Sequence, residues 1–393
     1  MLILLAAALF QSADDDFLKQ VAESNLKATV EKLVAFDTRM CLSDADDAKR
    51  GIGAARAWIK AEFERHAKGA KSEIKIDYHD WDDPSPRLAK DGKRVPQKNV
   101  YAILKGSKRP KEAIVFGAHY DSLNLRGAGN DAVAPGANDN ASGTAAVLEA
   151  FRILCRTPQE RTIIFVCFAA EEQGLIGALH FAQWLKEKAE FDVVVMLNND
   201  IVGGAKDDDG KPLNENELRC YSAPPEDSDS RRFARLAKIV VEKSSAGLKV
   251  LVKETIDRPK RGGDHQSFNK EGFTAIRFIE AVETDKIHHT PDDKTERIHF
   301  PYHVKSTKAD LALLLNMSNA PAAPDVKLED GKIVWTKVDG ADHYLVAVRE
   351  GNDFVQAAAS REFALKLEDK PVCVASVTKA GRISLFSKEV SIK

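Results

Sequence analysis

The chain has 393 residues, with 58 Lys and Arg against 60 Asp and Glu, which gives a formal net charge of −2 at pH 7. This length suffices for two or three domains, and the 44% of hydrophobic residues suffice for a large core. Without a basic excess, the composition argues against binding to nucleic acid or to an anionic membrane surface. A globular protein that acts on small molecules or peptides is therefore the starting expectation.

The first ten residues, MLILLAAALF, are all apolar, and small and then acidic residues follow them. Ten residues are too few to cross a bilayer, so the sequence predicts no membrane span here. The stretch fits the apolar core of a secretory signal covering residues 1–13, although it lacks a positively charged start. A buried N-terminal strand is the alternative. We favour export, and hence a secreted or periplasmic location.

The first third of the chain predicts two amphipathic helices and two short strands. Apolar residues recur at helical spacing over 14–36 and again over 52–68. The polar loop between them contains Arg39, to which the sequence assigns no role. Alternation over 73–78 predicts a half-exposed strand, and 100–104 predicts a further strand.

From residue 113 onward, continuous apolar strands alternate with helices. Apolar strands are predicted at 113–119, 163–166, 193–197 and 275–279, and helices at 141–154, 176–188, 230–245 and 302–316. Apolar runs without polar alternation are typical of strands buried on both faces. The sequence therefore predicts an α/β fold, an α/β/α sandwich with a mainly parallel mixed sheet. The polar stretch 203–225, with its acidic run at 207–209, is expected to be a solvated loop rather than a calcium site.

Beyond a linker at 321–324, which Pro residues stiffen, the composition changes. Short apolar runs follow, separated by turn residues, at 332–335, 344–348 and 372–377. They predict an all-β sandwich. Through Trp335 and the segments 341–344 and 381–384, this tail resembles a fibronectin type III domain, expected over residues 320–393. It brings no catalytic group of its own.

The five cysteines show no C-x-x-C spacing, which argues against a zinc cluster built on thiolates. Cys155 and Cys167 lie in apolar sequence and are expected to be packed thiols. Cys41 and Cys220 lie in loop-like sequence and could form a disulfide in an oxidising compartment, a question that the sequence leaves open.

Acidic residues and histidines lie at the ends of the predicted apolar strands and in the loops beside them. The set comprises His119, Asp139, Glu171, Glu172, Asp200 and His289. Because the carboxyl ends of parallel strands meet at one edge of a sheet, these groups are expected to lie close together. Alone, Glu171 and Glu172 would be the acidic start of a helix, which the helix dipole favours. Histidine and carboxylates without cysteine are instead the ligand chemistry of hydrolytic zinc or manganese sites.

Five short segments resemble, in order, the motifs of the M28 metallopeptidases, the family of the co-catalytic di-zinc aminopeptidases. They are AHYDS at 118–122, GANDNASG at 136–143, AEEQGL at 170–175, ND at 199–200 and HTPDD at 289–293. The resemblance falls within an expected peptidase domain at 14–319 and implies a phosphorylase/hydrolase-like α/β/α core. It also implies two Zn²⁺ ions, with one site able to accept another divalent metal.

The resemblance further implies a role for each residue of the motifs. The implied metal ligands are His119 and Asp200 on one ion, Glu172 and His289 on the other, and Asp139 as the bridge between them. Glu171 would be the general base, which takes a proton from a metal-bound water and later protonates the leaving amine. Asp121 would orient His119, with a simple turn aspartate as the alternative.

Two details of the motifs leave alternatives. His288 is adjacent to His289, but the following Thr-Pro-Asp matches the family pattern only with His289 as the ligand. Asp264 and His265 occupy a loop that lies near the substrate in the family, and ordinary helix capping by Asp264 is the alternative.

The expected function is a metal-dependent exopeptidase that acts on peptides or proteins, and most simply an aminopeptidase that releases N-terminal residues. A carboxypeptidase or dipeptidase of the same family is the alternative. A carboxypeptidase would need a cationic clamp for the substrate carboxylate, and the candidates are Arg231, Arg258, Arg261 and Arg277. A non-catalytic binding protein on the same scaffold is a further alternative, as is a glutaminyl cyclase with a single zinc. The complete set of ligands argues against both.

Overall fold

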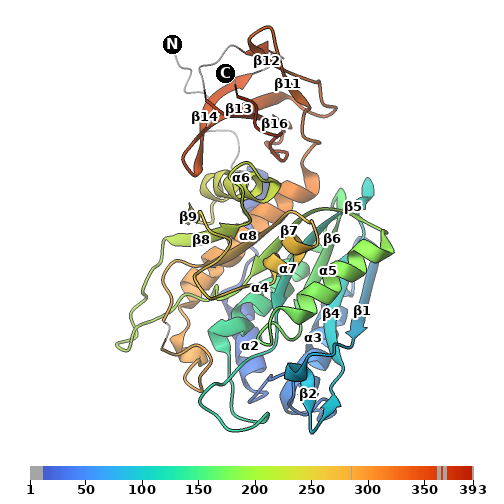
Figure 1. Cartoon of the computed structure of the whole chain (residues 1–393), viewed down its shortest axis with the longest axis vertical. Coiled ribbons are helices and arrows are strands. Elements are labelled where there is room, and N and C mark those ends of the chain that lie inside the picture. Colours follow the sequence, from blue (N-terminus) through green and yellow to red (C-terminus); the bar gives the residue numbers. More distant parts are fainter. Residues whose placement is uncertain (1–11, 285, 361–363, 366–369, 392–393) are drawn as a thin grey trace.

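The computed structural model describes residues 12–284, 286–360, 364–365 and 370–391 (Figure 1). The expected signal segment lies outside these residues, apart from Ser12 and Ala13 at the start of helix α1 (Ser12–Leu18). Among the described residues, no helix has both the length and the apolar character needed to cross a membrane.

The main body of the chain is built on one eight-stranded sheet with the order β1-β4-β6-β5-β7-β10-β8-β9. Its central strands run parallel: β6 (Arg161–Phe168), β5 (Arg109–His119), β7 (Asp192–Asn199) and β10 (Ala275–Glu280). Beyond β6, β4 (Gln97–Leu104) runs antiparallel to β6, and β1 (Ile74–Trp81) runs antiparallel to β4. Beyond β10, β8 (Glu217–Ser222) is antiparallel and β9 (Lys249–Val252) runs parallel to β8. The predicted mixed, mainly parallel sheet is confirmed.

Helices cover both faces of this sheet (Figure 1). One face carries α2 (Glu23–Val34), α3 (Gly51–Ala67), α4 (Ser142–Leu154), α6 (Asp229–Lys243) and α8 (Phe300–Asn319), and the other carries α5 (Ile176–Lys188) and α7 (His265–Lys270). Along β6, Phe165 packs into the first helix layer and its neighbour Val166 into the second. Burial on both faces explains why this strand is apolar at successive positions.

Smaller elements join the main ones. They are the 3₁₀ turns Pro86–Leu88 and Thr295–Arg297, the hairpin β2 (Ala89–Lys90) and β3 (Lys93–Arg94), and the π-type turn Ala137–Ala141.

Two expectations from the sequence are wrong, and one question that the sequence left open is answered. The helix expected over 14–36 is two helices, α1 and α2, with a break at 19–22. The polar stretch 203–225 is not one loop, because its last part forms strand β8, whose Leu218 is buried. Cys220 lies in the same strand, and the disulfide considered for it does not form, since all five cysteines are unpaired and buried.

The C-terminal residues form two small sheets. One has the order β11 (Val326–Glu329), β12 (Lys332–Trp335), β15 (Ala364–Leu365), and the other β14 (Asp353–Ser360), β13 (His343–Glu350), β16 (Val372–Val377). Trp335 of the first sheet and Val346 of the second belong to one apolar cluster between them. On the opposite face of β13, Leu345 joins the hydrophobic core that contains α6 and α8. The fibronectin type III resemblance and the domain boundaries stay predictions.

Polar contacts also fasten these sheets to the main body. Asn316 of α8 donates a hydrogen bond to the Ile383 carbonyl and accepts one from its N–H, both at 2.8 Å. Arg235 of α6 donates to the Asn352 carbonyl at 2.9 Å and lies over the Phe354 ring. The C-terminal sheets therefore pack against α6 and α8 through both apolar and polar contacts.

Candidate metal centre

The carboxyl ends of the central parallel strands bring the predicted ligands together. His119 is the last residue of β5, Asp200 follows β7, and the Glu171-Glu172 pair follows β6. Asp139 comes from the turn before α4, and His289 from the loop after β10. Three groups of side chains each have ligand atoms within 4.8 Å of one another: His119, Asp139 and Asp200; Asp139, Glu172 and His289; His119, Glu171 and Glu172.

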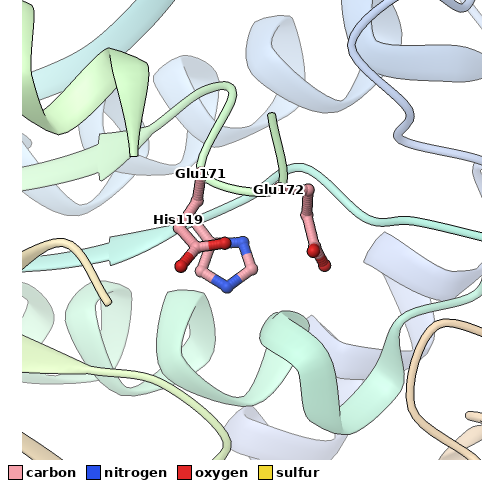
Figure 2. Close-up of side chains that lie close together, drawn as sticks. All are labelled: His119, Glu171 and Glu172. Carbon is pink, nitrogen blue, oxygen red and sulfur yellow. The ribbon is translucent and has the colours of Figure 1, made fainter. Parts of the chain in front are cut away.

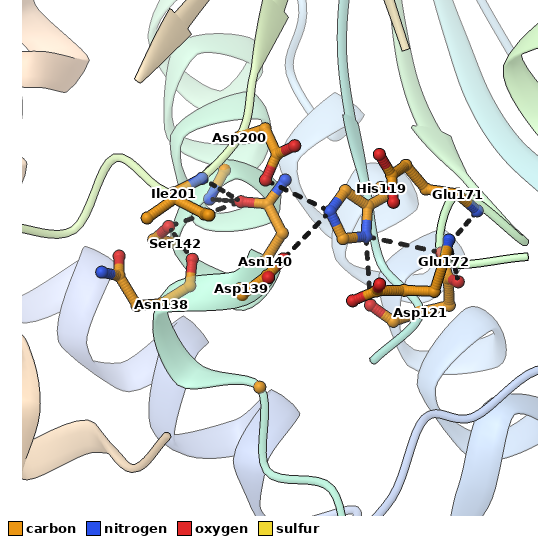
Figure 3. Close-up of polar contacts among 12 residues, drawn as sticks. His119, Asp121, Asn138, Asp139, Asn140, Ser142, Glu171, Glu172, Asp200 and Ile201 are labelled. Carbon is orange, nitrogen blue, oxygen red and sulfur yellow. Dashed lines mark hydrogen bonds and ion pairs between the residues drawn. The ribbon is translucent and has the colours of Figure 1, made fainter. Parts of the chain in front are cut away.

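Asp139 lies between two histidines. His119 Nε2 lies 3.3 Å from Oδ1 of Asp139 and 3.3 Å from Oδ1 of Asp200 (Figure 3). His289 Nε2 lies 3.1 Å from Oδ2 of Asp139 and 3.0 Å from Oε2 of Glu172. The two oxygens of one carboxylate thus face two separate histidine–carboxylate sets. This is the arrangement that a carboxylate bridging two cations requires.

The donor set fits a divalent transition metal. Each set offers one imidazole nitrogen and two carboxylates without thiolate, which is zinc ligand chemistry. Among the described residues, Oε1 of Glu172 is buried and lacks a hydrogen-bond partner. A buried, unpartnered carboxylate oxygen is costly unless a cation or a proton satisfies it.

Glu171 and Glu172 leave the turn after β6 in different directions. Figure 2 shows the Glu171 carboxylate beside the His119 ring and the Glu172 side chain apart from that ring, although ligand atoms of all three residues lie within 4.8 Å of one another. Ala170, just before them, has a φ of 60°. The N–H groups of Glu171 and Glu172 donate to the two carboxylate oxygens of Asp121, each at 3.2 Å (Figure 3). Neighbouring residues therefore reach different groups of the site.

Asp121 also lies against the inner nitrogen of His119. The His119 Nδ1 atom is 3.2 Å from the main-chain oxygen of Asp121 and 3.5 Å from its Oδ1. An acceptor at Nδ1 favours the tautomer that leaves Nε2 free to bind a cation. Asp121 thus has contacts that suit both expectations, an orienting residue and a residue that holds a turn.

The sequence profile of peptidase family M28 matches residues 99–313, more than half of the chain. The chain belongs to peptidase family M28. The resemblance seen in the motifs is confirmed for the family, and so is the expectation of an enzyme.

Curated relatives support the same family. A Pyrenophora tritici-repentis protein named probable zinc metalloprotease is 33% identical over 339 aligned residues, covering 79% of this chain and 77% of the relative. A Pyricularia oryzae protein of the same name is 34% identical over 371 aligned residues, covering 84% and 72%.

Solved structures share the fold of this M28 peptidase. The LapA aminopeptidase of Legionella pneumophila has a TM-score of 0.61 at 20% identity, covering 80% of this chain and 78% of that one. A glutaminyl cyclase of Bacteroides thetaiotaomicron has a TM-score of 0.56 at 17% identity, covering 75% and 98%. Since proteins of both activities match, the likeness shows the fold and does not choose between them.

In the M28 peptidase, Arg277 on β10 is one of the residues whose role the sequence left open. It is fully buried, and its guanidinium lies 2.7 Å from Oδ2 of Asp200 and 2.8 Å from Oδ2 of Asp257. Asp200 therefore faces Arg277 with one oxygen and His119 with the other. Burial opposes the charge of Asp200, but Arg277 and then His119 hold its pKa below the ordinary value.

The other candidate clamps for a substrate carboxylate have their own partners, with one exception. Arg231 donates to the main-chain oxygens of Lys253 and Glu254, and Arg258 pairs with Glu283. Arg261 is exposed, and its side chain has no partner among the described residues.

Asp264 and His265 lie at the start of α7, and both are buried. The Asp264 carboxylate makes no capping hydrogen bond, so the capping alternative is wrong. Both of its oxygens lack a partner among the described residues, and burial raises its pKa to about 8. His265 Nε2 lies 2.8 Å from the Ile256 carbonyl oxygen. Because these side chains are buried, the structure gives neither of them an accessible substrate-facing surface.

The adjacent Glu171 and Glu172 carboxylates of the M28 site have raised pKa values. Burial, and then the charge of Asp139, raises the pKa of Glu172 to about 7. Burial also raises the pKa of Glu171 well above its ordinary value. Burial works against a charged His289, but its contacts with Asp139 and Glu172 raise its pKa to about 11. His289 is thus protonated near neutral pH, on an imidazole that would have to lose the proton to bind a metal ion.

The sequence motifs predicted no role for Asn140, which links two parts of the site by hydrogen bonds. Its side chain accepts hydrogen bonds from the N–H groups of Gly143 and Ile201 and donates to the Asn199 carbonyl (Figure 3). The start of α4 is thereby joined to the end of β7, where Asp200 lies. Its place inside the GANDNASG motif was the only signal of this role.

Proposed function

We propose that this M28 peptidase is a zinc-dependent aminopeptidase with two metal positions. The observation that carries the proposal is Asp139, whose two carboxylate oxygens face His119 and His289 separately. One ion would be held by His119, Asp139 and Asp200, and the other by Asp139, Glu172 and His289. The zinc metalloprotease names of the curated relatives favour zinc as the metal.

Bound zinc supplies an activated water and polarises the scissile carbonyl group. The chain's own contribution to proton transfer is Glu171, which lies beside His119 and belongs to neither three-ligand set that contains Asp139. Glu171 would take a proton from the attacking water and deliver it to the leaving amine. Its raised pKa suits a group that must both accept and release a proton.

An aminopeptidase is favoured over a carboxypeptidase because most of the candidate clamp arginines already have partners within the fold. Arg231, Arg258 and Arg277 are already bound within the fold and are not available to a substrate carboxylate. Arg261 remains as the one candidate, and it is exposed at the surface.

Export rests on the sequence alone. The apolar N-terminal stretch and its small residues support a secreted or periplasmic enzyme. Secretion of the full chain with loss of the first residues, shown by N-terminal sequencing, would test this part of the proposal.

The proposed function is tested by comparing Glu171→Gln with Glu172→Gln. Glu171→Gln should lower turnover of a peptide with a free N-terminus by about 10²- to 10⁴-fold with zinc content unchanged. Glu172→Gln should lower zinc content as well as turnover. Zinc content is measured by mass spectrometry and turnover by release of the first residue. Loss of zinc from Glu171→Gln would contradict the assignment of that residue as the base.

The same assay separates the two exopeptidase classes. An N-acetylated copy of the peptide should not be cleaved, whereas amidation of its C-terminus should have little effect. Cleavage of the acetylated peptide from its C-terminus would identify a carboxypeptidase. Zinc binding with no hydrolysis of either peptide would favour a non-catalytic protein.

A further inference from the structure

The turn that carries Asp139 is held from both sides by buried charged residues. Its carbonyl groups at Pro135 and Gly136 accept hydrogen bonds from Arg39. Its N–H groups at residues 137–139 all donate to Asp293. The Arg39 guanidinium therefore binds carbonyl oxygens of the turn, and Asp293 binds its N–H groups.

Arg39 lies in the loop to which the sequence assigned no role, and it is fully buried. Its Nε donates to the Tyr120 carbonyl at 2.7 Å and its Nη2 to the Gly136 carbonyl at 2.8 Å. Its Nη1 donates to the carbonyls of Leu33 and Pro135. The planar fork of an arginine thus links the residue after His119 to the turn before Asp139, and within the described part of the chain it pairs with no carboxylate.

Asp293 binds the same turn at three points. Its main-chain oxygen accepts from the Ala137 N–H at 3.0 Å, its Oδ1 from Asn138 at 2.9 Å and its Oδ2 from Asp139 at 2.9 Å. Asp293 is only four residues beyond His289. The loop with His289 and the turn with Asp139 are thereby joined at a fixed distance.

We infer that Asp293 and Arg39 are positioning residues, which set the Asp139 carboxylate between His119 and His289 before any metal binds. This inference rests on the proposed metal site. Asp139 must present its two oxygens in two directions, and a turn free to rotate would lose that geometry. The contacts at Tyr120 and at Asp293 connect the turn to both histidine segments.

Asp293→Asn is the sharpest variant. A carboxylate only accepts hydrogen bonds, whereas an amide has one accepting oxygen and a donating NH₂ group. The NH₂ group would face the N–H of Asn138 or Asp139, donor against donor, so one buried amide would lose its partner. Asp292→Asn is the matched control, because it removes the same charge from the neighbouring residue. Asp292 is exposed and pairs with Arg126.

The experiment measures zinc affinity of the full chain by competition with a coloured chelator. Asp293→Asn should bind zinc about 10- to 100-fold more weakly than the unaltered protein, as outer partners of metal ligands do when mutated. Asp292→Asn should keep nearly the original affinity, because an exposed ion pair contributes little. Original affinity in folded Asp293→Asn would overturn the inference. Failure of the unaltered protein to bind zinc would instead overturn the proposed function.

Arg39→Lys provides a second variant if Asp293→Asn does not fold. Lysine keeps the positive charge but cannot reach carbonyls on separate segments with one fork. The melting temperature is measured with and without zinc. A positioning role predicts a smaller zinc-induced rise than in the unaltered protein. An equal loss in both states, with the zinc-induced rise unchanged, would show that Arg39 is merely structural.

Discussion

At the scale of single residues, a proton and a metal ion would compete for the same atoms of the proposed site. In the metal-free protein, contacts with Asp139 and Glu172 raise the pKa of His289 to about 11 against burial. An imidazole whose pKa is higher in the folded state than in the unfolded state stabilises the fold. This stabilisation is complete below the pKa of the unfolded state, near 6.5, and is lost as the pH rises through the pKa of the folded state. The stability that protonated His289 gives the metal-free protein should therefore decline above neutral pH.

Zinc binding is accordingly expected to depend on pH. Zinc must displace the proton from His289, so its affinity and the rise in melting temperature that it causes should increase from about pH 6 to about pH 8. Calorimetric titration in buffers of different ionisation enthalpy would count the protons released. An affinity independent of pH, with no proton release, would contradict a protonated histidine in the metal-free site.

Sequence motifs found the candidate ligands because these residues lie in short, contiguous patterns at strand ends. His119 ends a strand that its apolar run made visible, and Asp200 and the Glu171-Glu172 pair follow two more such strands. Arg39 and Asp293 had no such signal as positioning residues, because their partners are main-chain groups far away in the sequence. The partners of a side chain that binds the backbone cannot be predicted from residue types.

At the scale of elements, the turn after β6 depends on a neighbouring strand. Asn99 of β4 is fully buried, accepts from the Ala169 N–H at 2.9 Å and donates to the Gly177 carbonyl at 2.9 Å. It therefore joins the two ends of the segment that contains Glu171 and Glu172. At Gly177, an added Cβ would lie 1.9 Å from the Ala169 oxygen, so α5 can approach the turn only with glycine there.

Asn99→Ala should weaken both the fold and the site. Two buried backbone groups would lose their partner, which should lower the free energy of unfolding by about 1–3 kcal/mol. Turnover should fall as the Glu171 segment loosens. Chemical denaturation and peptide hydrolysis check the two effects. Lys98→Ala is the control on the same strand, since Lys98 pairs with Asp80 near the surface and should change little.

The elements that the sequence missed are those with weak hydrophobic signals. Strand β9 has only four residues, and β8 was hidden in a stretch rich in polar and acidic residues. The assignment of β8 depends on its pairing with β10 and that of β9 on its pairing with β8, and pairing is a tertiary property. The central strands were predictable because burial on both faces leaves a continuous apolar run.

At the scale of the whole molecule, the C-terminal sheets share a hydrophobic core with the peptidase body. Strand β13 is buried on both faces, with Val346 toward the partner sheet and Leu345 toward the core that contains α6 and α8. Asn316 and Arg235 add hydrogen bonds across the same contact. A unit so attached is expected to unfold together with the body rather than swing as a separate module.

The full chain should therefore melt in one cooperative transition, as followed by scanning calorimetry. Asn316→Ala should lower the midpoint, because both main-chain groups of Ile383 would lose their partner. A shortened chain that ends at Asn319 would expose the apolar surface of α6 and α8 and should be less stable, although it keeps every proposed ligand. Two separated transitions in the full chain would show that the C-terminal sheets unfold on their own.

The ligands come from five segments spread between His119 and His289, and this separation has a consequence for the survival of the enzyme. No local fragment contains both metal positions, so tight zinc binding requires the central strands to be assembled. A ligand that binds only the folded state shifts the folding equilibrium by mass action. The proposed enzyme would then gain resistance to degradation where zinc is abundant and lose it where chelators remove the metal. Zinc supply would set the lifetime of the enzyme as well as its rate.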